Sequence, residues 1–140
     1  MTPEDERFLR RAIELAKHGR ETGEAPFGSL LVGPDGQVLA EAWNTVLGDK
    51  DISAHPELKM ARWAARELDA ETAAKTTMYT STQPCAMCAG GLARSGLGRV
   101  VYALSAEQFV ELTGFQGFPE PRQEGPALLD EARVPIDGYY

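Results

Sequence analysis

Short apolar runs, separated by turn residues or by longer helical segments, constrain the fold of this chain most strongly. The runs PFGSLLVG and QVLAEAW flank Pro34-Asp35-Gly36, a combination typical of a tight turn between two strands. Two later runs, TMYTST and RVVYAL, are rich in β-branched and aromatic residues and have the composition of strands. The sequence therefore predicts an initial hairpin followed by further strands.

Helical segments precede and connect these strands. Four stretches carry an apolar stripe at helical spacing, a capping residue or a closing glycine: residues 3–19, 56–68, 86–96 and 105–114. A final run, ARVPI, is short enough for a last strand. Strands joined through helices indicate a mixed sheet with helices on both faces. We predict one α/β domain over residues 1–140, built as a three-layer α-β-α sandwich.

Composition and charge limit the functional classes open to the chain. Hydrophobic residues make up 43% and charged residues 25%, as in ordinary globular proteins. The balance of 14 basic and 21 acidic residues gives a net charge of −7, which works against binding a polyanion. The first residues, MTPEDERFLRR, lack the features of a signal peptide, and no apolar run has transmembrane length. We expect a cytoplasmic protein that binds no membrane and no large nucleic acid.

The two cysteines, Cys85 and Cys88, lie in the sequence QPCAMCAG. In a cytosolic chain a C-x-x-C pair indicates metal binding or redox chemistry more often than a structural disulfide. The spacing alone favours metal and redox use equally. At the start of a helix both thiols share one face, and the helix N-terminus favours the thiolate that binds metal.

The stretch SAHPEL, residues 53–58, helps to decide between metal binding and redox chemistry at the two cysteines. Pro56 is suited to the first helical position, so Glu57 falls in the first turn, where the helix dipole alone favours an acid. His55 can supply a third ligand beside the two thiolates, and three ligands leave a position for water, as in catalytic zinc sites. Two thiolates and one imidazole favour zinc over iron. Redox use of the cysteines leaves His55 and Glu57 without a role.

Together, His55-Pro56-Glu57 and Pro84-Cys85-Ala86-Met87-Cys88 match the H-x-E…P-C-x-x-C pattern of zinc-dependent base deaminases. At these residues the chain resembles the cytidine deaminase-like superfamily. The segment EAPFGSLLVGPDGQVLAEAWN resembles its guanine deaminase and tRNA adenosine deaminase branch. The resemblance implies a mixed five-stranded sheet between helices, one Zn²⁺ per chain and a homodimer or larger assembly. It also implies hydrolytic attack on a ring carbon that bears an amino group, with release of ammonia.

The resemblance also implies roles for single residues. His55, Cys85 and Cys88 would hold zinc, and Glu57 would carry protons. Two further positions have a second interpretation each. Asn44 would bind the substrate ring, although an asparagine after a strand is commonly a turn residue. Phe27 would line the pocket, or else it belongs to the core.

Backbone N–H groups near Ala54 and Cys85 would hold the activated water or a developing oxyanion. The segment 115–126, rich in proline and glycine, is either a lid or a surface loop. As a lid it would bring Phe118 as an apolar cover and Glu120 as a possible second acid. The terminal Tyr139-Tyr140 either caps a pocket, for instance that of a neighbouring subunit, or forms a packed or frayed end.

We therefore predict a zinc-dependent hydrolytic deaminase of a small nucleobase or nucleoside, with a purine-type ring favoured by the hairpin and Asn44. A pyrimidine or triazine-like ring is the alternative, because Gln116-Gly117 stands where guanine deaminases have acidic residues and Gly90–Ala93 lacks their aromatic residue. Editing of tRNA is disfavoured by the charge. A non-catalytic, zinc-stabilised binding module of the same fold is the further alternative, against which Glu57 argues, since a structural metal site needs no such acid.

Overall fold

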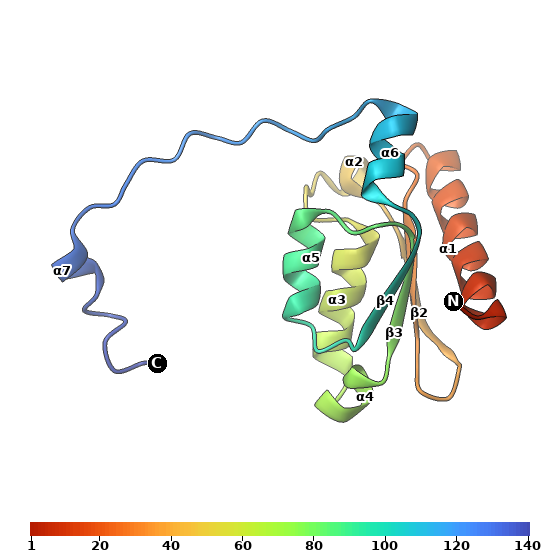
Figure 1. The fold of residues 1–140 in the computed structure, drawn as a ribbon, viewed down its shortest axis with the longest axis horizontal. Coiled ribbons are helices and arrows are strands. Elements are labelled where there is room, and N and C mark those ends of the chain that lie inside the picture. Colours follow the sequence, from red (N-terminus) through yellow and green to blue (C-terminus); the bar gives the residue numbers. More distant parts are fainter.

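The computed structural model describes residues 1–140. Its helices and strands follow the predicted order as far as residue 113, with short helices added, but the predicted last strand is absent (Figure 1). The elements are α1 (Pro3–Glu21), β1 (Gly28–Val32), β2 (Val38–Trp43), α2 (Val46–Asp49), α3 (Pro56–Glu67), α4 (Ala70–Ala74), β3 (Thr77–Thr82), α5 (Ala86–Ala93), β4 (Arg99–Leu104), α6 (Ala106–Thr113) and α7 (Leu129–Ala132). The short helices α2, α4 and α7 were not predicted.

The sheet is mixed and has the strand order β2-β1-β3-β4. Strand β1 pairs antiparallel with both β2 and β3, and β3 pairs parallel with β4. Helix α1 covers one face, while α3 and α5 lie on the other (Figure 1). The three-layer α-β-α class is therefore confirmed.

The prediction of five strands is wrong, because the sheet has four. The run ARVPI, residues 132–136, forms the end of α7 and the turns after it. This segment lies far from β4 (Figure 1), so its backbone has no neighbouring strand with which to form a ladder.

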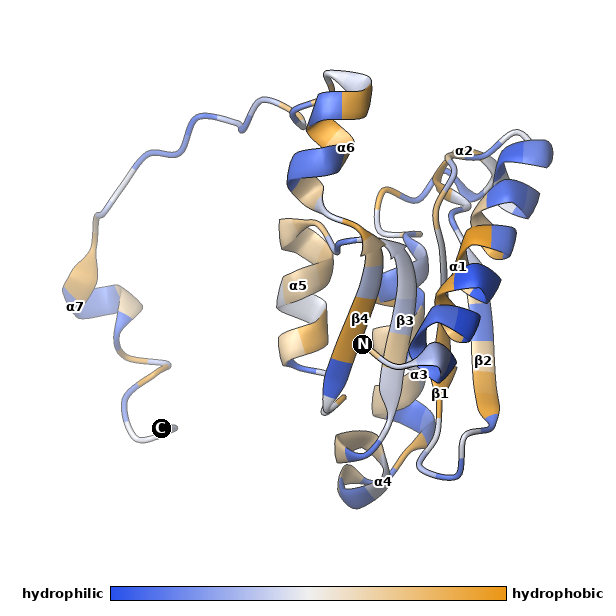
Figure 2. Cartoon of the chain, turned by 45° about the vertical axis from the view of Figure 1, so that its right-hand side comes forward, coloured by the Kyte–Doolittle hydropathy of each residue, from blue (hydrophilic) through white to orange (hydrophobic).

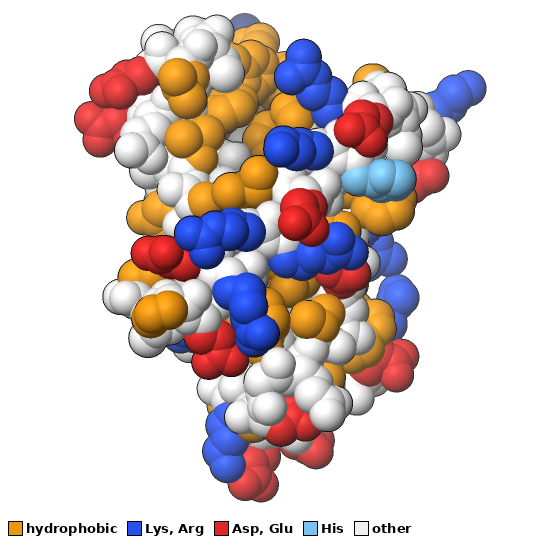
Figure 3. Space-filling model, turned by 90° about the vertical axis from the view of Figure 1, so that its right-hand side faces the viewer, with side chains coloured by type: hydrophobic (Ala, Val, Ile, Leu, Met, Phe, Trp, Pro, Cys, Tyr) orange, Lys and Arg blue, Asp and Glu red, His pale blue; other side chains and the backbone are white.

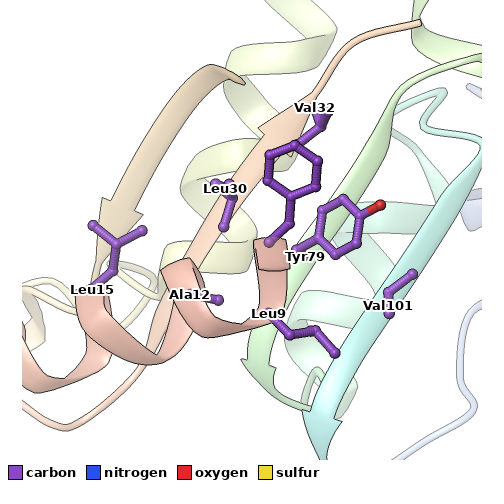
Figure 4. Close-up of a cluster of buried hydrophobic side chains, with 8 residues drawn as sticks. Leu9, Ala12, Leu15, Leu30, Val32, Tyr79 and Val101 are labelled. Atoms are coloured by element: carbon purple, nitrogen blue, oxygen red, sulfur yellow. The ribbon is translucent and has the colours of Figure 1, made fainter. Parts of the chain in front are cut away.

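Alternation along β1 divides the core between the two faces of the sheet. Leu30 and Val32 pack with residues of α1, β3 and β4, shown in Figure 4, whereas Leu31 packs on the α3 side with Met60 and Met78. Gly28 points toward α1, where a Cβ atom would lie 2.6 Å from the carbonyl oxygen of Ala12. The glycine therefore lets α1 approach the start of β1.

A buried carboxylate joins α1 to the sheet. Asp5 is only 3% exposed and completes the capping box with Thr2 at the start of α1. Its oxygens also accept two bonds from Arg99 at 2.9 and 2.8 Å and one from the hydroxyl of Tyr79 at 2.7 Å. These contacts hold the pKa of Asp5 well below its usual range, with the Arg99 bonds as the largest cause.

The last residues form an arm, defined here as residues 114–140, that leaves the rest of the chain after α6. Gly114 ends that helix in the left-handed conformation, with φ of 71°. Every residue of the arm is exposed, and the arm lies apart from the other elements in Figures 1 and 2. Eight large apolar side chains are therefore exposed on it: Phe115, Phe118, Leu128, Leu129, Val134, Ile136, Tyr139 and Tyr140.

Helix α1 lies on the side of the molecule that faces away from the arm (Figure 1). This side carries basic and acidic side chains next to one another (Figure 3). Ion pairs along α1, such as Arg7–Glu4 and Arg10–Glu6, neutralise much of its positive charge. This face offers no uniformly basic stripe for a polyanion. None of the helices combines the length and the apolar character that a membrane span requires.

Candidate metal centre and active site

Three potential metal ligands converge where α3 and α5 begin. The Nδ1 atom of His55 lies 3.6 Å from Sγ of Cys85 and 3.4 Å from Sγ of Cys88. Their ligand atoms all lie within 4.8 Å of one another. Zinc bonds of about 2.3 Å to sulfur and about 2.0 Å to nitrogen, in a tetrahedral arrangement, place the two ligand atoms about 3.5 Å apart. The cluster therefore has the donor types and the spacing of a zinc site.

Local sequence explains how the two helices present these ligands. His55 is the N-cap of α3, with Pro56 at the first helical position, and Cys85 is the N-cap of α5. The helices pack closely because Gly91 of α5 faces Leu58 of α3, where a Cβ atom would collide with the leucine side chain. This small residue therefore lets α5 approach α3 and brings the two helix starts together.

Glu57 lies beside the cluster and is 6% exposed. Its Oε1 accepts a bond from the hydroxyl of Ser29 at 3.3 Å, and that hydroxyl also lies 2.8 Å from Oγ1 of Thr80. Burial raises the pKa of Glu57, against the smaller opposing effect of its hydrogen bonds. A raised pKa makes this carboxylate a better proton acceptor than an exposed glutamate, which suits a general acid–base.

Burial also shifts the titration of two ligands. It raises the pKa of the Cys88 thiol, with the neighbouring Glu57 as the next cause, and it lowers the pKa of His55. Both shifts oppose the charged form of the residue. A neutral imidazole is the form that coordinates a metal, and a divalent cation on the cluster favours the Cys88 thiolate.

The loop after β2 carries Asn44, which is 4% exposed. Its Oδ1 accepts a bond from the N–H of Val46 at 3.0 Å, so the side chain does serve the turn that the sequence suggested as an alternative. This bond uses the oxygen and leaves the Nδ2 group to donate to a ligand. The Nζ atom of Lys59 holds the same loop through the carbonyl of Trp43 at 2.9 Å and the hydroxyl of Thr45 at 2.5 Å.

The same loop is joined to both sides of the site. The N–H of Asn44 donates to the carbonyl of Phe27 at 3.1 Å, and the N–H of Thr45 donates to the carbonyl of Ala54 at 3.1 Å. The N–H of Ala54, however, donates to the carbonyl of Asp51 at 3.0 Å. The N–H of Ala54 is therefore already used within the chain. Cys85, in contrast, is the N-cap of α5, at the end of the helix where backbone N–H groups have no intrahelical partner.

The remaining predicted site residues lie in different places. Phe27 is half-buried, and its ring centroid lies 5.7 Å from that of Phe109 on α6. Phe118 is 85% exposed and contacts Phe115, while Glu120 and the terminal tyrosines are exposed on the arm. Within one chain, the arm therefore does not close over the metal cluster.

Sequence reasoning missed four polar residues around the site: Ser29, Lys59, Thr80 and Gln83. Ser29 and Thr80 face each other across β1 and β3, and the only sequence sign of Ser29 is a polar residue inside an apolar run. The side chain of Gln83 accepts a bond from the N–H of Ala106 at 2.9 Å. Gln83 thereby ties the start of α6 to the segment that carries Cys85.

Comparisons with known proteins agree with this geometry. The family model of the cytidine and deoxycytidylate deaminase zinc-binding region matches residues 2–104. A probable cytosine deaminase of Schizosaccharomyces pombe is 31% identical over all of this chain and 94% of its own length. A tRNA-specific adenosine deaminase of Haemophilus influenzae is 34% identical over 72% of this chain, which spans 58% of that relative. The crystal structure of guanine deaminase from Bacillus subtilis matches 97% of this chain and 92% of its own, with 30% identity and a TM-score of 0.78.

This chain belongs to the cytidine and deoxycytidylate deaminase zinc-binding family. As a member of that family with a His55, Cys85 and Cys88 cluster, it is a hydrolytic deaminase that binds one Zn²⁺ per chain. The relatives named above differ in substrate, and they include a cytosine, a guanine and a tRNA deaminase.

Proposed function

We propose that this protein deaminates a small purine-type base or nucleoside, with Glu57 as the residue that transfers protons. The observation that carries the proposal is the position of Glu57, which is buried beside the three zinc ligands and held there by Ser29 at 3.3 Å. Burying a carboxylate in this position costs desolvation energy. A purely structural zinc site needs only its ligands and no such carboxylate.

Each residue of the site has a step in this reaction. The zinc held by His55, Cys85 and Cys88 would supply a water of lowered pKa. Glu57 accepts one proton from the attacking water and gives it to a ring nitrogen as the water oxygen bonds to the ring carbon. It then carries the second proton of that water to the departing amino group. The bond between the ring carbon and the amino nitrogen breaks, and ammonia leaves. Ser29 holds one oxygen of the Glu57 carboxylate, Oε1, through its hydroxyl.

A purine-type ring is favoured by the surroundings of the cluster. Asn44 has an amide Nδ2 group left to donate to a ring acceptor, and Phe27, the residue before β1, is joined to Asn44 by a backbone bond. The similarity to the guanine deaminase structure extends over 97% of this chain and supports the same choice. The pyrimidine alternative is supported by the similarity to the probable cytosine deaminase.

Ammonia release from a panel of bases and nucleosides tests the proposal. The panel contains guanine, adenine, cytosine, their nucleosides and a triazine, with zinc quantified in each sample. We expect release from a purine by the wild type and loss of at least a factor of about 10² in Glu57→Gln, typical of general acid–base catalysis, at equal zinc content. Glu107→Gln, on the surface of α6, is the matched control and retains activity.

The other outcomes identify the alternatives. Release from cytosine or a triazine alone would replace the purine proposal with the pyrimidine or triazine one. Equal activity of wild type and Glu57→Gln would remove Glu57 from the chemistry. One zinc per chain without ammonia release from any ring would favour the non-catalytic binding module.

We also propose that the chain acts as a homodimer in the cytoplasm. The support for the dimer is the arm, whose eight exposed apolar side chains have no covering partner in one chain. Light scattering of the full chain should give the mass of two chains, and replacement of Leu128 and Leu129 by aspartate should lower it. Replacement of Glu124 by Asp, on the same arm, should leave it unchanged. A monomeric wild type at micromolar concentration would refute the dimer.

A further inference from the structure

Four phenylalanines form a continuous contact chain from the edge of the site to the arm. The ring of Phe27 contacts Phe109 with centroids 5.7 Å apart, Phe109 contacts Phe115 at 6.4 Å, and Phe115 contacts Phe118 at 5.3 Å. These separations are those of favourable aromatic pairs. Of the four, Phe109 stands in the middle and is the residue that links Phe27 to α6.

Strand geometry places Phe27 on the side of the sheet where the chemistry lies. Gly28 points toward α1, while Ser29 points to Glu57. The bond from the N–H of Asn44 to the carbonyl of Phe27 continues the pairing of β1 with β2 by one residue. Since successive side chains of a strand alternate, Phe27 shares the Ser29 side.

Helix α6 is fixed next to the ligand cluster. Gln83, two residues before Cys85, accepts a bond from the N–H of Ala106, and its own N–H donates to the carbonyl of Leu104 at 2.7 Å. The capping box of Ser105 and Gln108 holds the first turn of the helix. Phe109 therefore stands on a rigid element that the metal-binding segment itself positions.

Charge around this aromatic chain restricts what can lie against it. From Ala106 to Pro121 the chain carries three acidic residues, Glu107, Glu111 and Glu120, and no lysine or arginine. Such a surface attracts neither phosphate nor a polynucleotide. An uncharged, planar ring is not repelled by these carboxylates and can stack on the half-buried aromatic surface.

We propose that Phe109 is a specificity-determining residue, which with Phe27 forms an apolar wall for the face of an uncharged planar heterocycle, while the acidic residues around this wall disfavour nucleotides. The inference rests on the proposed deaminase function and narrows its substrate class. Phe109 acts by holding Phe27 in place and by adding aromatic surface, so that it stabilises the bound ring rather than the proton transfer at Glu57.

Steady-state kinetics of Phe109→Ala tests this role with the base that the wild type turns over. Of the two aromatic pairs that this variant loses, the pair with Phe27 supports the ring, and its loss, worth about 0.5–1.5 kcal/mol, raises KM roughly two- to tenfold. We expect kcat to change less than twofold, because the groups that transfer protons remain. Phe109→Tyr should retain the wild-type KM. Leu112→Ala, a 74% exposed position on the same helix, is the matched control.

A second comparison tests the substrate class. The wild type should turn over the base with a kcat/KM at least tenfold higher than that for the nucleoside 5′-monophosphate of the same ring. A monophosphate preferred over the base would overturn the inference. So would a Phe109→Ala variant with unchanged KM, or one that lowers kcat alone with normal zinc content and melting temperature.

Binding measurements separate this inference from the proposed function. If no ring is deaminated, the proposed function fails, and the dissociation constants of guanine and cytosine for the zinc-loaded protein are measured by calorimetry. Weaker binding by Phe109→Ala than by Leu112→Ala would still support the aromatic wall, while equal or absent binding would overturn it. Phe109→Leu, which keeps most of the apolar volume, replaces the alanine variant if that protein does not fold.

Discussion

The carboxylate of Asp5 should contribute a large share of the stability of this fold. We consider Asp5→Asn, which keeps the shape of the side chain and one acceptor oxygen for the N–H of Thr2 but removes the charge. The variant weakens two bonds from Arg99 and one from Tyr79, all between 2.7 and 2.9 Å. Since the pair Asp5–Arg99 joins α1 to β4, its loss should lower the free energy of unfolding of the whole sheet.

The size of the effect follows from the burial of the two partners. Breaking a buried ion pair costs about 3–5 kcal/mol, and hydrogen bonds to charged groups contribute about 1.5–3 kcal/mol each. The Arg99 side chain is 51% exposed, so solvent screens its part of the pair and the lower value applies. We expect a loss of about 3 kcal/mol at pH 7, which corresponds to a fall in Tm of about 12 °C for a domain of this size.

Urea unfolding followed by circular dichroism at several pH values measures this loss. The folded-state pKa of Asp5 lies well below that of an unfolded aspartate, about 3.9, so its contribution is complete above about pH 4 and decreases as the pH falls further. The difference between wild type and Asp5→Asn should therefore shrink below pH 4. Glu6→Gln, at an exposed pair on the same helix, should change stability by less than about 0.5 kcal/mol. A difference that stays constant between pH 7 and pH 3, or an equally stable variant, would refute the reasoning.

Three further substitutions test other parts of the structure. Gly28→Ala places a Cβ atom 2.6 Å from α1 and should cost about 1–3 kcal/mol in urea unfolding, whereas Gly90→Ala, with its nearest contact at 3.6 Å, should be neutral or stabilising. Cys85→Ser should bring the zinc content after dialysis against a weak chelator well below one per chain, while Met87→Ala keeps it; full zinc in the serine variant would exclude Cys85 as a ligand. Lys59→Met frees the loop that carries Asn44, so KM for the ring should rise more than kcat falls, and an unchanged KM would speak against this positioning role.

The zinc cluster could be predicted because its signals are local. Pro56 and Pro84 mark the segments in which two helices begin, and the ligands stand at or just inside those helix starts. Helix starts are set by a few adjacent residues, so the positions of His55, Cys85 and Cys88 follow from short stretches of sequence. Their convergence on one point could be expected from the resemblance to a known family.

Other contacts could not be predicted, because they depend on register and on neighbours distant in sequence. Ser29 meets Thr80 only because β1 and β3 pair in one particular register. The helices α2 and α4, of four and five residues, are too short to show an apolar stripe. The run ARVPI has strand-like residues, yet it could form a strand only if the arm returned to the free edge of β4.

The stabilising network and the candidate site occupy different faces of the same strands. Tyr79 of β3 points to Asp5 and α1, while its neighbour Thr80 points to Ser29 and the Glu57 side. Alternation along β3 thus separates the two polar clusters by the thickness of the sheet. Because the two sites share no side chain, Asp5→Asn should lower the Tm and leave the zinc content and the KM unchanged below the melting range. A variant that loses zinc at 25 °C while still folded would show that the two faces are coupled through the backbone of β3.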